Sequence, residues 1–133
     1  MKVMNPVLPG FNPDPSLVRA GDDYYIATST FEWFPGICIH HSKDLVNWEI
    51  LSYALTDEAK FDIEGMDTAC GIWAPNLTYD NGTFYLIYTI VYTNRHRFKD
   101  THNFMVTASD PKGPWSDPIP LNKMGFDPSL FHD

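Results

Sequence analysis

A short pattern that recurs along the chain constrains its fold more than any other feature. Pro-Ser-Leu stands at 15–17, Pro-Asn-Leu at 75–77, and Pro-Ser-Leu again at 128–130. The first two copies are each followed by a turn and an aromatic-rich run, GDD before YYIATST and DNG before TFYLIYT. Such self-similarity in successive segments is typical of repeat architectures, in which each copy is one supersecondary unit.

The repeat extends beyond this pattern. A serine and a tryptophan six positions apart occur in both units, as Ser42 with Trp48 and as Ser109 with Trp115. Turn residues between β-rich runs predict four short strands per unit. These strands are expected at 16–20, 24–30, 37–42 and 48–51 in the first unit, and at 76–79, 83–90, 104–109 and 115–119 in the second. Four strands in a repeat of about 50–60 residues are typical of a β-propeller blade.

The run at 83–90 indicates how the units pack. Both of its alternating sets of side chains are apolar, Phe84, Leu86 and Tyr88 on one side and Tyr85 and Ile87 on the other. A strand loses the simple apolar/polar alternation when both of its faces are buried. Sheets stacked face to face around an axis bury strands in this way, so the sequence predicts an all-β propeller. A β-sandwich of about seven or eight strands is the alternative, but it needs no repeated unit.

The third unit begins in GFDPSLFHD, where the sequence stops. Aligned with the second unit, Asp133 corresponds to Asp80, the first residue of the hairpin turn. Two blades and one strand cannot close a ring of four or more blades. We therefore expect the N-terminal part of a longer propeller domain, with blade 1 at about 11–55, blade 2 at about 71–120 and the start of blade 3 at about 125–133.

Composition narrows the function classes. Lys+Arg total 9 against Asp+Glu 17, a net charge of -8, which disfavours nucleic acid because phosphate contacts need clustered Lys and Arg. No apolar run approaches the ~20 residues of a membrane span, and no signal-peptide segment precedes Pro6 and Pro9. Cys38 and Cys70 are too few for a disulfide scaffold and are expected to be reduced. We expect a cytoplasmic protein that binds neither nucleic acid nor membrane, and no spacing predicts a metal or cofactor site.

Two acidic residues occupy the same place in two of the units. Asp14 and Asp127 each precede Pro-Ser-Leu, and Ala74 stands at the corresponding place in the middle unit. In a propeller, equivalent positions at the start of the inner strands point toward a common place on the axis. Paired carboxylates are what glycoside hydrolysis requires, and a like charge nearby raises the pKa of a carboxylic acid. The alternative is that both aspartates only form Asx-turns before proline.

Aromatic residues accompany these aspartates. Trp73 directly precedes Ala74, and Phe31 begins the ring-rich segment FEWF. Sugars pack their C–H faces on such rings, so Phe31 and Trp73 are candidate substrate-binding residues. The alternative for each ring is a place in the core between blades, which we favour for Trp48 and Trp115.

Three segments carry a family resemblance: FNPDPSLVRAGDDYYIATSTFEWFPGI, GIWAPNLTY and GFDPSLFHD. They resemble the β-xylosidases and α-L-arabinofuranosidases of glycoside hydrolase family 43. The resemblance implies a five-bladed propeller that hydrolyses with inversion, followed in the β-xylosidase members by a C-terminal β-sandwich. It implies that Asp14 is the general base and Asp127 the auxiliary carboxylate that tunes and orients the acid. Phe31 and Trp73 match residues that line the pocket for the terminal sugar, with Ala74 beside them.

The family's general acid, a glutamate on a later blade, has no counterpart in this sequence. Glu32 and Glu64 are the acidic residues nearest the candidate pocket, but neither matches it. We expect an exo-acting enzyme on xylo- or arabino-oligosaccharides that needs residues beyond Asp133 for activity. Its isolated N-terminal part is expected to be unstable or to self-associate as a homo-oligomer. The alternatives are an endo-arabinanase-like propeller glycosidase and a non-catalytic propeller that binds carbohydrate or serves as a scaffold. The choice between xylose and arabinose stays open.

Overall fold

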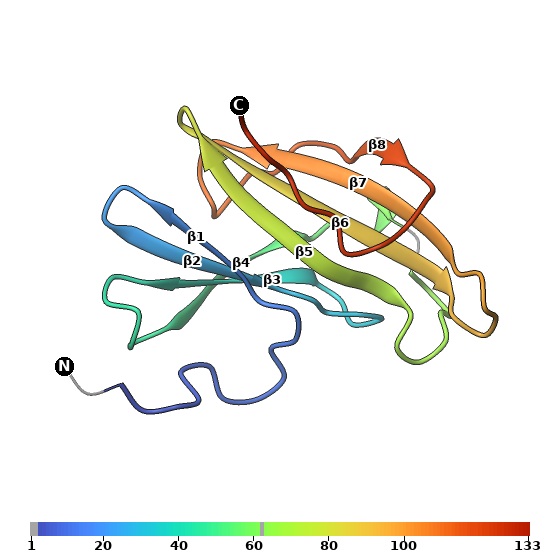
Figure 1. Ribbon diagram of the computed structural model, residues 1–133, viewed down its shortest axis with the longest axis horizontal. Helices are drawn as coiled ribbons and strands as arrows, with labels where there is room; N and C mark the ends of the chain where they lie inside the picture. Colours follow the sequence, from blue (N-terminus) through green and yellow to red (C-terminus); the bar gives the residue numbers. More distant parts are fainter. Residues whose placement is uncertain (1–2, 62) are drawn as a thin grey trace.

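The computed structural model describes residues 3–61 and 63–133, and its regular structure is almost entirely β. It contains two four-stranded antiparallel sheets, each with its strands in sequence order, and Figure 1 shows one sheet above the other. The first sheet consists of β1 (Ser16–Ala20), β2 (Asp23–Thr28), β3 (Gly36–Ser42) and β4 (Glu49–Leu55). The second consists of β5 (Gly71–Asp80), β6 (Thr83–Thr93), β7 (Asp100–Ala108) and β8 (Ile119–Asn122). The all-β class and the four strands per repeat are confirmed.

A tight hairpin joins the first two strands of each sheet, β1 to β2 and β5 to β6. Asp80 pairs with Thr83 across the turn from β5 to β6. Asn81 and Gly82 between them both adopt left-handed backbone, with φ of 47° and 82°. Positive φ at both central residues matches the right-handed twist of the strands, which is why Asn-Gly is such a strong hairpin signal. The hairpin predicted from the sequence is therefore confirmed.

Several strands differ from their predicted bounds. β4 runs on to Leu55, β6 runs on to Thr93 and β7 begins earlier, at Asp100, so all three are longer than expected. Two other strands differ at prolines. β5 begins at Gly71 rather than at 76, because a bulge between Trp73 and Asn76 lets the strand continue past Pro75. The last strand lies at Ile119–Asn122 rather than at 115–119. Pro114 directly precedes the expected strand and Pro118 lies within it, and neither has an N–H to donate to a ladder.

The core lies between the two sheets. From β6, Phe84, Leu86, Tyr88 and Ile90 pack in one cluster with Ile37 and Ile39 of β3 and other buried residues. Tyr25 of β2 meets Phe84 edge to face at 5.3 Å between ring centroids. The strand β5 lies against β1, β2 and β3. This stacking of whole sheets is what the doubly apolar strand at 83–90 predicts.

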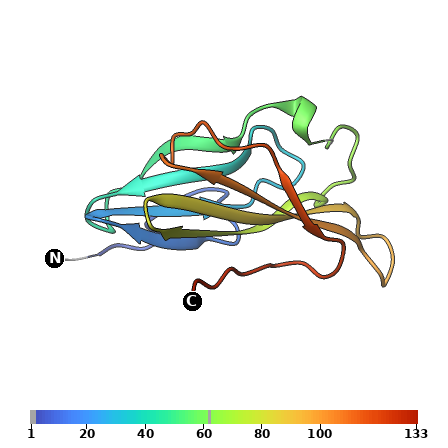
Figure 2. The same ribbon diagram turned by 90° about the horizontal axis from the view of Figure 1, so that it is seen from above.

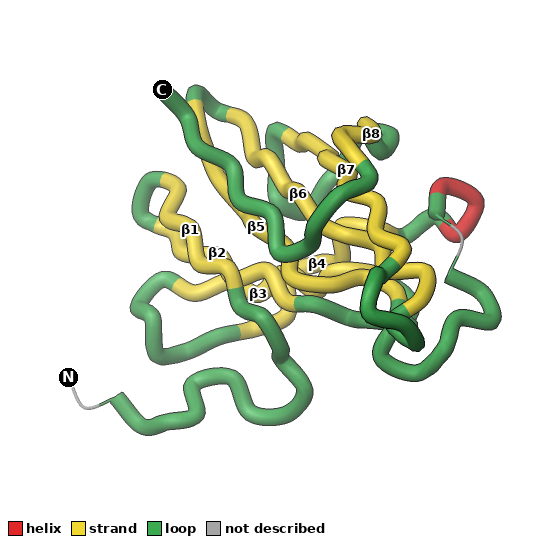
Figure 3. Tube along the Cα trace, turned by 45° about the vertical axis from the view of Figure 1, so that its right-hand side comes forward, coloured by secondary structure: helices red, strands yellow, loops and turns green. Residues whose placement is uncertain are grey.

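The C-terminal segment runs beside β5, as Figures 1 and 3 both show. His132 Nε2 lies 2.9 Å from Thr78 Oγ1 of β5, and the His132 ring contacts that of Tyr85 of β6. The segment therefore follows the side of β5 opposite to β1. Figure 2 shows this segment on one side of the molecule and the short 3-10 helix Glu58–Lys60 on the other.

Two expectations from the sequence concern the cysteines and membrane-spanning segments. Cys38 and Cys70 are both buried and unpaired. Within residues 3–61 and 63–133, no helix has the length and apolar character to cross a membrane.

Candidate active site

Asp14 lies in the segment that leads into β1, with its backbone in the left-handed region at φ 52°. The Ser29 hydroxyl donates a 2.5 Å hydrogen bond to Asp14 Oδ2, and the Ser29 N–H donates to the Pro13 carbonyl at 3.1 Å. Ser29 directly follows β2 and is itself buried. The end of β2 therefore fixes both the backbone and the carboxylate of Asp14, although this residue is exposed.

Asp127 repeats the backbone of Asp14, with φ of 57° in front of the equivalent Pro-Ser-Leu. The pKa of Asp127 lies above its usual value, first because partial burial penalises the charged carboxylate and second because the negative charge of Asp14 repels it. The charge of Asp14 therefore acts on Asp127, its counterpart in the third repeat.

A buried polar network holds the loop in front of Asp127. The Thr89 hydroxyl donates to Asn103 Oδ1 at 2.6 Å, and both residues are buried. Asn103 Nδ2 donates to Asn122 Oδ1 at 2.8 Å and to the Met124 carbonyl at 3.0 Å, and it also reaches the Gly125 carbonyl at 3.4 Å. Because these contacts end two residues before Asp127, they anchor the chain that carries its carboxylate.

Four rings form an aromatic cluster, and one of them directly precedes Asp127 in the sequence: Phe11, Phe31, Trp73 and Phe126. Phe31 meets Trp73 edge to face at 6.3 Å between centroids, and Trp73 meets Phe126 in the same manner at 5.4 Å. Phe11 lies 6.0 Å from Phe31. Rings in mutual contact that stay partly exposed suit the apolar faces of a sugar, while carboxylates engage its hydroxyls.

Phe31 is held in an unusual conformation. Its φ is 51°, which a bulky side chain rarely adopts. Two backbone hydrogen bonds stabilise it, from Phe31 N–H to the Ile72 carbonyl at 3.0 Å and from Ile72 N–H to the Phe31 carbonyl at 2.9 Å. Gly71 permits this approach, because a Cβ there would lie 2.3 Å from the Phe31 oxygen. A bridge between the two sheets therefore places Phe31 beside Trp73.

Trp73 and its neighbours are anchored through the loop before β5. The Trp73 indole N–H donates to the Ala69 carbonyl at 2.9 Å, and the Ala69 N–H donates to Glu32 Oε2 at 3.1 Å. The carboxylate of Glu32 therefore stabilises this loop. Glu32 and Glu64 border a cavity of about 550 Å³ with Phe34 and Phe61. Ala74 follows Trp73 within the bulge of β5 and contributes only a methyl group where the other two repeats carry a carboxylate.

Positive side chains also lie near the aromatic cluster. The Lys99 ammonium is 5.3 Å from the centroid of the Phe126 ring. Arg95 forms an ion pair with Asp67 in the loop before Trp73. In the described part of the chain, no group of three or more His, Cys, Asp or Glu side chains is arranged to hold a metal ion.

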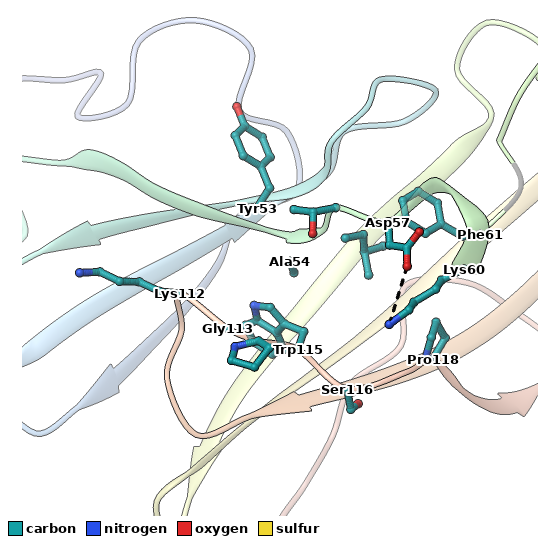
Figure 4. Close-up of a pocket in the computed structure, with 13 residues that line it drawn as sticks. Tyr53, Ala54, Asp57, Lys60, Phe61, Lys112, Gly113, Trp115, Ser116 and Pro118 are labelled. Carbon is teal, nitrogen blue, oxygen red and sulfur yellow. Dashed lines mark ion pairs between the residues drawn. The ribbon is translucent and has the colours of Figure 1, made fainter.

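A separate cavity of about 230 Å³ lies between the outer part of the first sheet and the turn after β7 (Figure 4). Tyr53, Trp115 and Lys60 are among its lining residues. Lys60 is paired with Asp57 at 4.0 Å and with Asp117 at 2.6 Å, so its charge is already compensated. The cavity borders the 3-10 helix, on the side away from the C-terminal segment (Figure 2). It lacks the paired carboxylates that glycoside chemistry needs.

Sequence reasoning missed several residues of this region. Phe126 directly precedes Asp127 and Phe11 precedes Asp14 by three residues, and this closeness in sequence was the available signal. Ser29 and Asn103 gave no signal, because their roles depend on contacts with segments distant in the chain.

Comparison with known proteins identifies the family of this chain. The sequence profile of glycosyl hydrolases family 43 matches residues 3–133. The xylosidase/arabinosidase 43B of Humicola insolens is 58% identical over 132 residues, which make up 99% of this chain and 24% of that protein. The beta-xylosidase of Bacillus subtilis (strain 168) is 57% identical over 133 residues, 100% of this chain and 25% of that protein.

A solved structure gives the same relationship in three dimensions. The xylan beta-1,4-xylosidase from Bacillus halodurans C-125 superposes with a TM-score of 0.97 and 62% identity, over 99% of this chain and 25% of that one. The chain thus spans about a quarter of the length of the relatives that it matches. With the family profile covering nearly all of its residues, the chain belongs to glycosyl hydrolases family 43.

Proposed function

We propose that this chain supplies the first two blades, and the beginning of a third, of an exo-acting glycoside hydrolase of inverting mechanism. Its substrates are xylan-derived oligosaccharides, from which it removes terminal xylose, arabinose or both. The names of the similar proteins, which include xylosidases and arabinosidases, support this substrate class. We further propose a ring of five blades for the complete enzyme, as in the family.

One observation carries the proposal. Asp14 and Asp127 occupy equivalent repeat positions with the same left-handed backbone, and the charge of Asp14 contributes to the raised pKa of Asp127. Two carboxylates that influence each other beside partly exposed rings support a site where a sugar is bound and a glycosidic bond is hydrolysed. Asx-turns alone would not require the charge of Asp14 to act on Asp127.

The proposed mechanism assigns a role to each residue. Asp14 is the general base, because an inverting enzyme needs a carboxylate to take a proton from the attacking water. The Ser29 hydroxyl holds Asp14 Oδ2, which fixes the carboxylate relative to that water. Asp127 is the auxiliary carboxylate that raises the pKa of the general acid by like-charge repulsion. Phe31 and Trp73 stack on the terminal sugar, and Ala74 leaves space beside it.

The test uses the complete enzyme and the variant Asp14→Asn, assayed on nitrophenyl xyloside and nitrophenyl arabinofuranoside. We expect turnover to fall by about 10²–10⁴-fold, the usual contribution of general base catalysis. Asp22→Asn is the matched control, because Asp22 lies in the exposed turn between β1 and β2 and pairs with Arg19, outside the candidate site. Retention of more than about 10% of the activity by Asp14→Asn would contradict the role of this residue.

The same preparation separates the alternatives. Release of oligosaccharides from arabinan in place of monosaccharides would indicate the endo-arabinanase-like enzyme. Sugar binding without turnover in the wild type would indicate a non-catalytic module. We expect the 133-residue chain alone to be inactive, because Glu32 is engaged with Ala69 and no residue of the chain matches the general acid.

A further inference from the structure

Equivalent side chains form hydrogen bonds between successive repeats. Ser16 Oγ, in the first Pro-x-Leu pattern, accepts the backbone N–H of Leu77 in the second at 3.0 Å. Asn76 Oδ1, in the second pattern, accepts the backbone N–H of Leu130 in the third at 2.9 Å. In both cases the middle residue of one pattern binds the leucine of the next, so the contact is itself a repeated feature.

Asn76 lies at the centre of this arrangement. Its Nδ2 donates to Ser16 Oγ at 3.5 Å, while its Oδ1 binds Leu130. A carboxamide carries both donors and an acceptor, so this one side chain contacts β1 in the repeat before its own and the C-terminal segment in the repeat after it. The C-terminal segment that it binds runs directly beside β5 (Figure 3).

The tethered positions are close in sequence to the candidate carboxylates. Ser16 follows Asp14 by two residues, and Leu130 follows Asp127 by three. The intervening Pro15 and Pro128 have a fixed φ, which limits the freedom of both connections. At roughly 3.3 Å per extended residue, each carboxylate is only about 7–10 Å along the chain from a contact of Asn76.

We propose that Asn76 is a positioning residue that sets the separation of Asp14 and Asp127. This inference rests on the proposed function, since the separation matters for the pair of carboxylates in catalysis. A change in the Asn76 contacts shifts the third segment relative to the first and moves Asp127 away from Asp14. A displacement of about 1 Å at a catalytic group is sufficient to reduce the rate by about 100-fold.

The decisive comparison is between Asn76→Ser and Asn76→Ala in the complete enzyme. The two variants differ by one hydroxyl group and are otherwise matched in size. Ser16 shows that a serine at this repeat position reaches the next leucine N–H, so Asn76→Ser keeps the bond to Leu130 and Asn76→Ala loses it. We expect kcat of Asn76→Ala to fall by about 10- to 100-fold with little change in KM, and that of Asn76→Ser to stay within about threefold of the wild type.

Hydrogen–deuterium exchange of the peptide that contains Leu130 provides a readout independent of turnover. Exchange is expected to accelerate in Asn76→Ala and to remain slow in Asn76→Ser. The inference is overturned if the two variants have equal kcat, or if exchange at Leu130 is unchanged in Asn76→Ala. An inactive wild-type enzyme would contradict the proposed function instead, whereas an active wild type with an equally active Asn76→Ala would contradict only the role of Asn76.

Discussion

The carboxyl group of Asp127 combines partial burial with repulsion from Asp14, and both raise its pKa above the ordinary value of 3.8. Folding therefore favours the protonated form of this group. That contribution to stability is fully present below about pH 4 and is lost as the pH rises through the higher pKa of the folded state. At neutral pH the charged Asp127 carboxylate therefore lowers the free energy of unfolding, a cost that its function requires.

Asp127→Asn is expected to be more stable than the wild type at pH 7, because asparagine stays neutral, and to lose this advantage near pH 3. The gain in Tm should not exceed about 4 °C, since Asp127 is exposed and solvent screens its charge. Thermal unfolding of both proteins across this pH range measures the difference. A difference that is independent of pH, or a wild type that is the more stable protein at pH 7, would contradict the assigned cause.

Gly71 permits the contact that holds Phe31. Gly71→Ala places a Cβ 2.3 Å from the Phe31 oxygen at a φ of +89°, and we expect the free energy of unfolding to fall by at least about 3 kcal/mol. Gly82→Ala is the control, because its φ of +82° is similar and no atom lies within 4 Å of its Cβ. That variant should cost about 1–2 kcal/mol. If chemical denaturation shows that both variants lose the same free energy of unfolding, the close approach of the Phe31 oxygen to Gly71 does not matter for stability.

At the scale of single residues, the sequence was informative where a repeat marked a position. Asp14 and Asp127 were found because they precede the same tripeptide. Phe126 was not, although it packs on Trp73, because the first repeat has Pro13 at the corresponding place. Ser29 acts through a contact between distant segments, which no local pattern encodes. Asn76 does stand in the repeated Pro-x-Leu pattern, but the pattern does not show that its side chain binds the next repeat.

Among the elements, alternation and turn chemistry predicted the strands of each hairpin. Some strands are longer than predicted, such as β4 and β7, and two others differ at prolines. Pro75 lies inside β5, where a bulge accommodates its missing N–H. Pro114 and Pro118 move the last strand to Ile119–Asn122, beyond the position of Trp115. Sequence patterns predict where a strand is favoured, whereas the exact bounds depend on which partner N–H and C=O groups are within reach.

At the scale of the elements, one prediction concerns Asn103 of β7, which links β6 to the loop before Asp127. Asn103→Ala leaves the Thr89 hydroxyl and the Met124 carbonyl without their partner, so the free energy of unfolding should fall by about 2–3 kcal/mol. Turnover of the complete enzyme should fall as well, because the loop carries Asp127. Thr89→Val is the control: it should cost about 1 kcal/mol and leave turnover unchanged, since the loop contacts of Asn103 remain. Equal turnover in both variants would contradict the anchoring role of Asn103.

At the scale of the whole molecule, apolar side chains outside the strands are exposed to solvent, and within the described residues one edge strand of the second sheet has no partner on its outer side. Phe98, Met124 and Phe131 have exposed fractions of 84%, 83% and 87%. The strand β8 is exposed along its entire length and pairs with β7 on one side. An unpaired strand edge and exposed apolar side chains each favour association with other chains. The net charge of -8 opposes such association by mutual repulsion.

These opposing terms predict how the 133-residue chain behaves in isolation. We expect it to form dimers or larger species at about 50 µM, and the associated fraction to rise with salt, because ions screen repulsion between chains while the apolar contacts remain. Sedimentation velocity at low and high NaCl measures both effects. The double variant Met124→Ser/Phe131→Ser should associate less, whereas Leu45→Ser, an exposed apolar position in the turn between β3 and β4, should not change the distribution. A chain that stays monomeric at both salt concentrations, or associates less at high salt, would show that these groups do not drive its assembly.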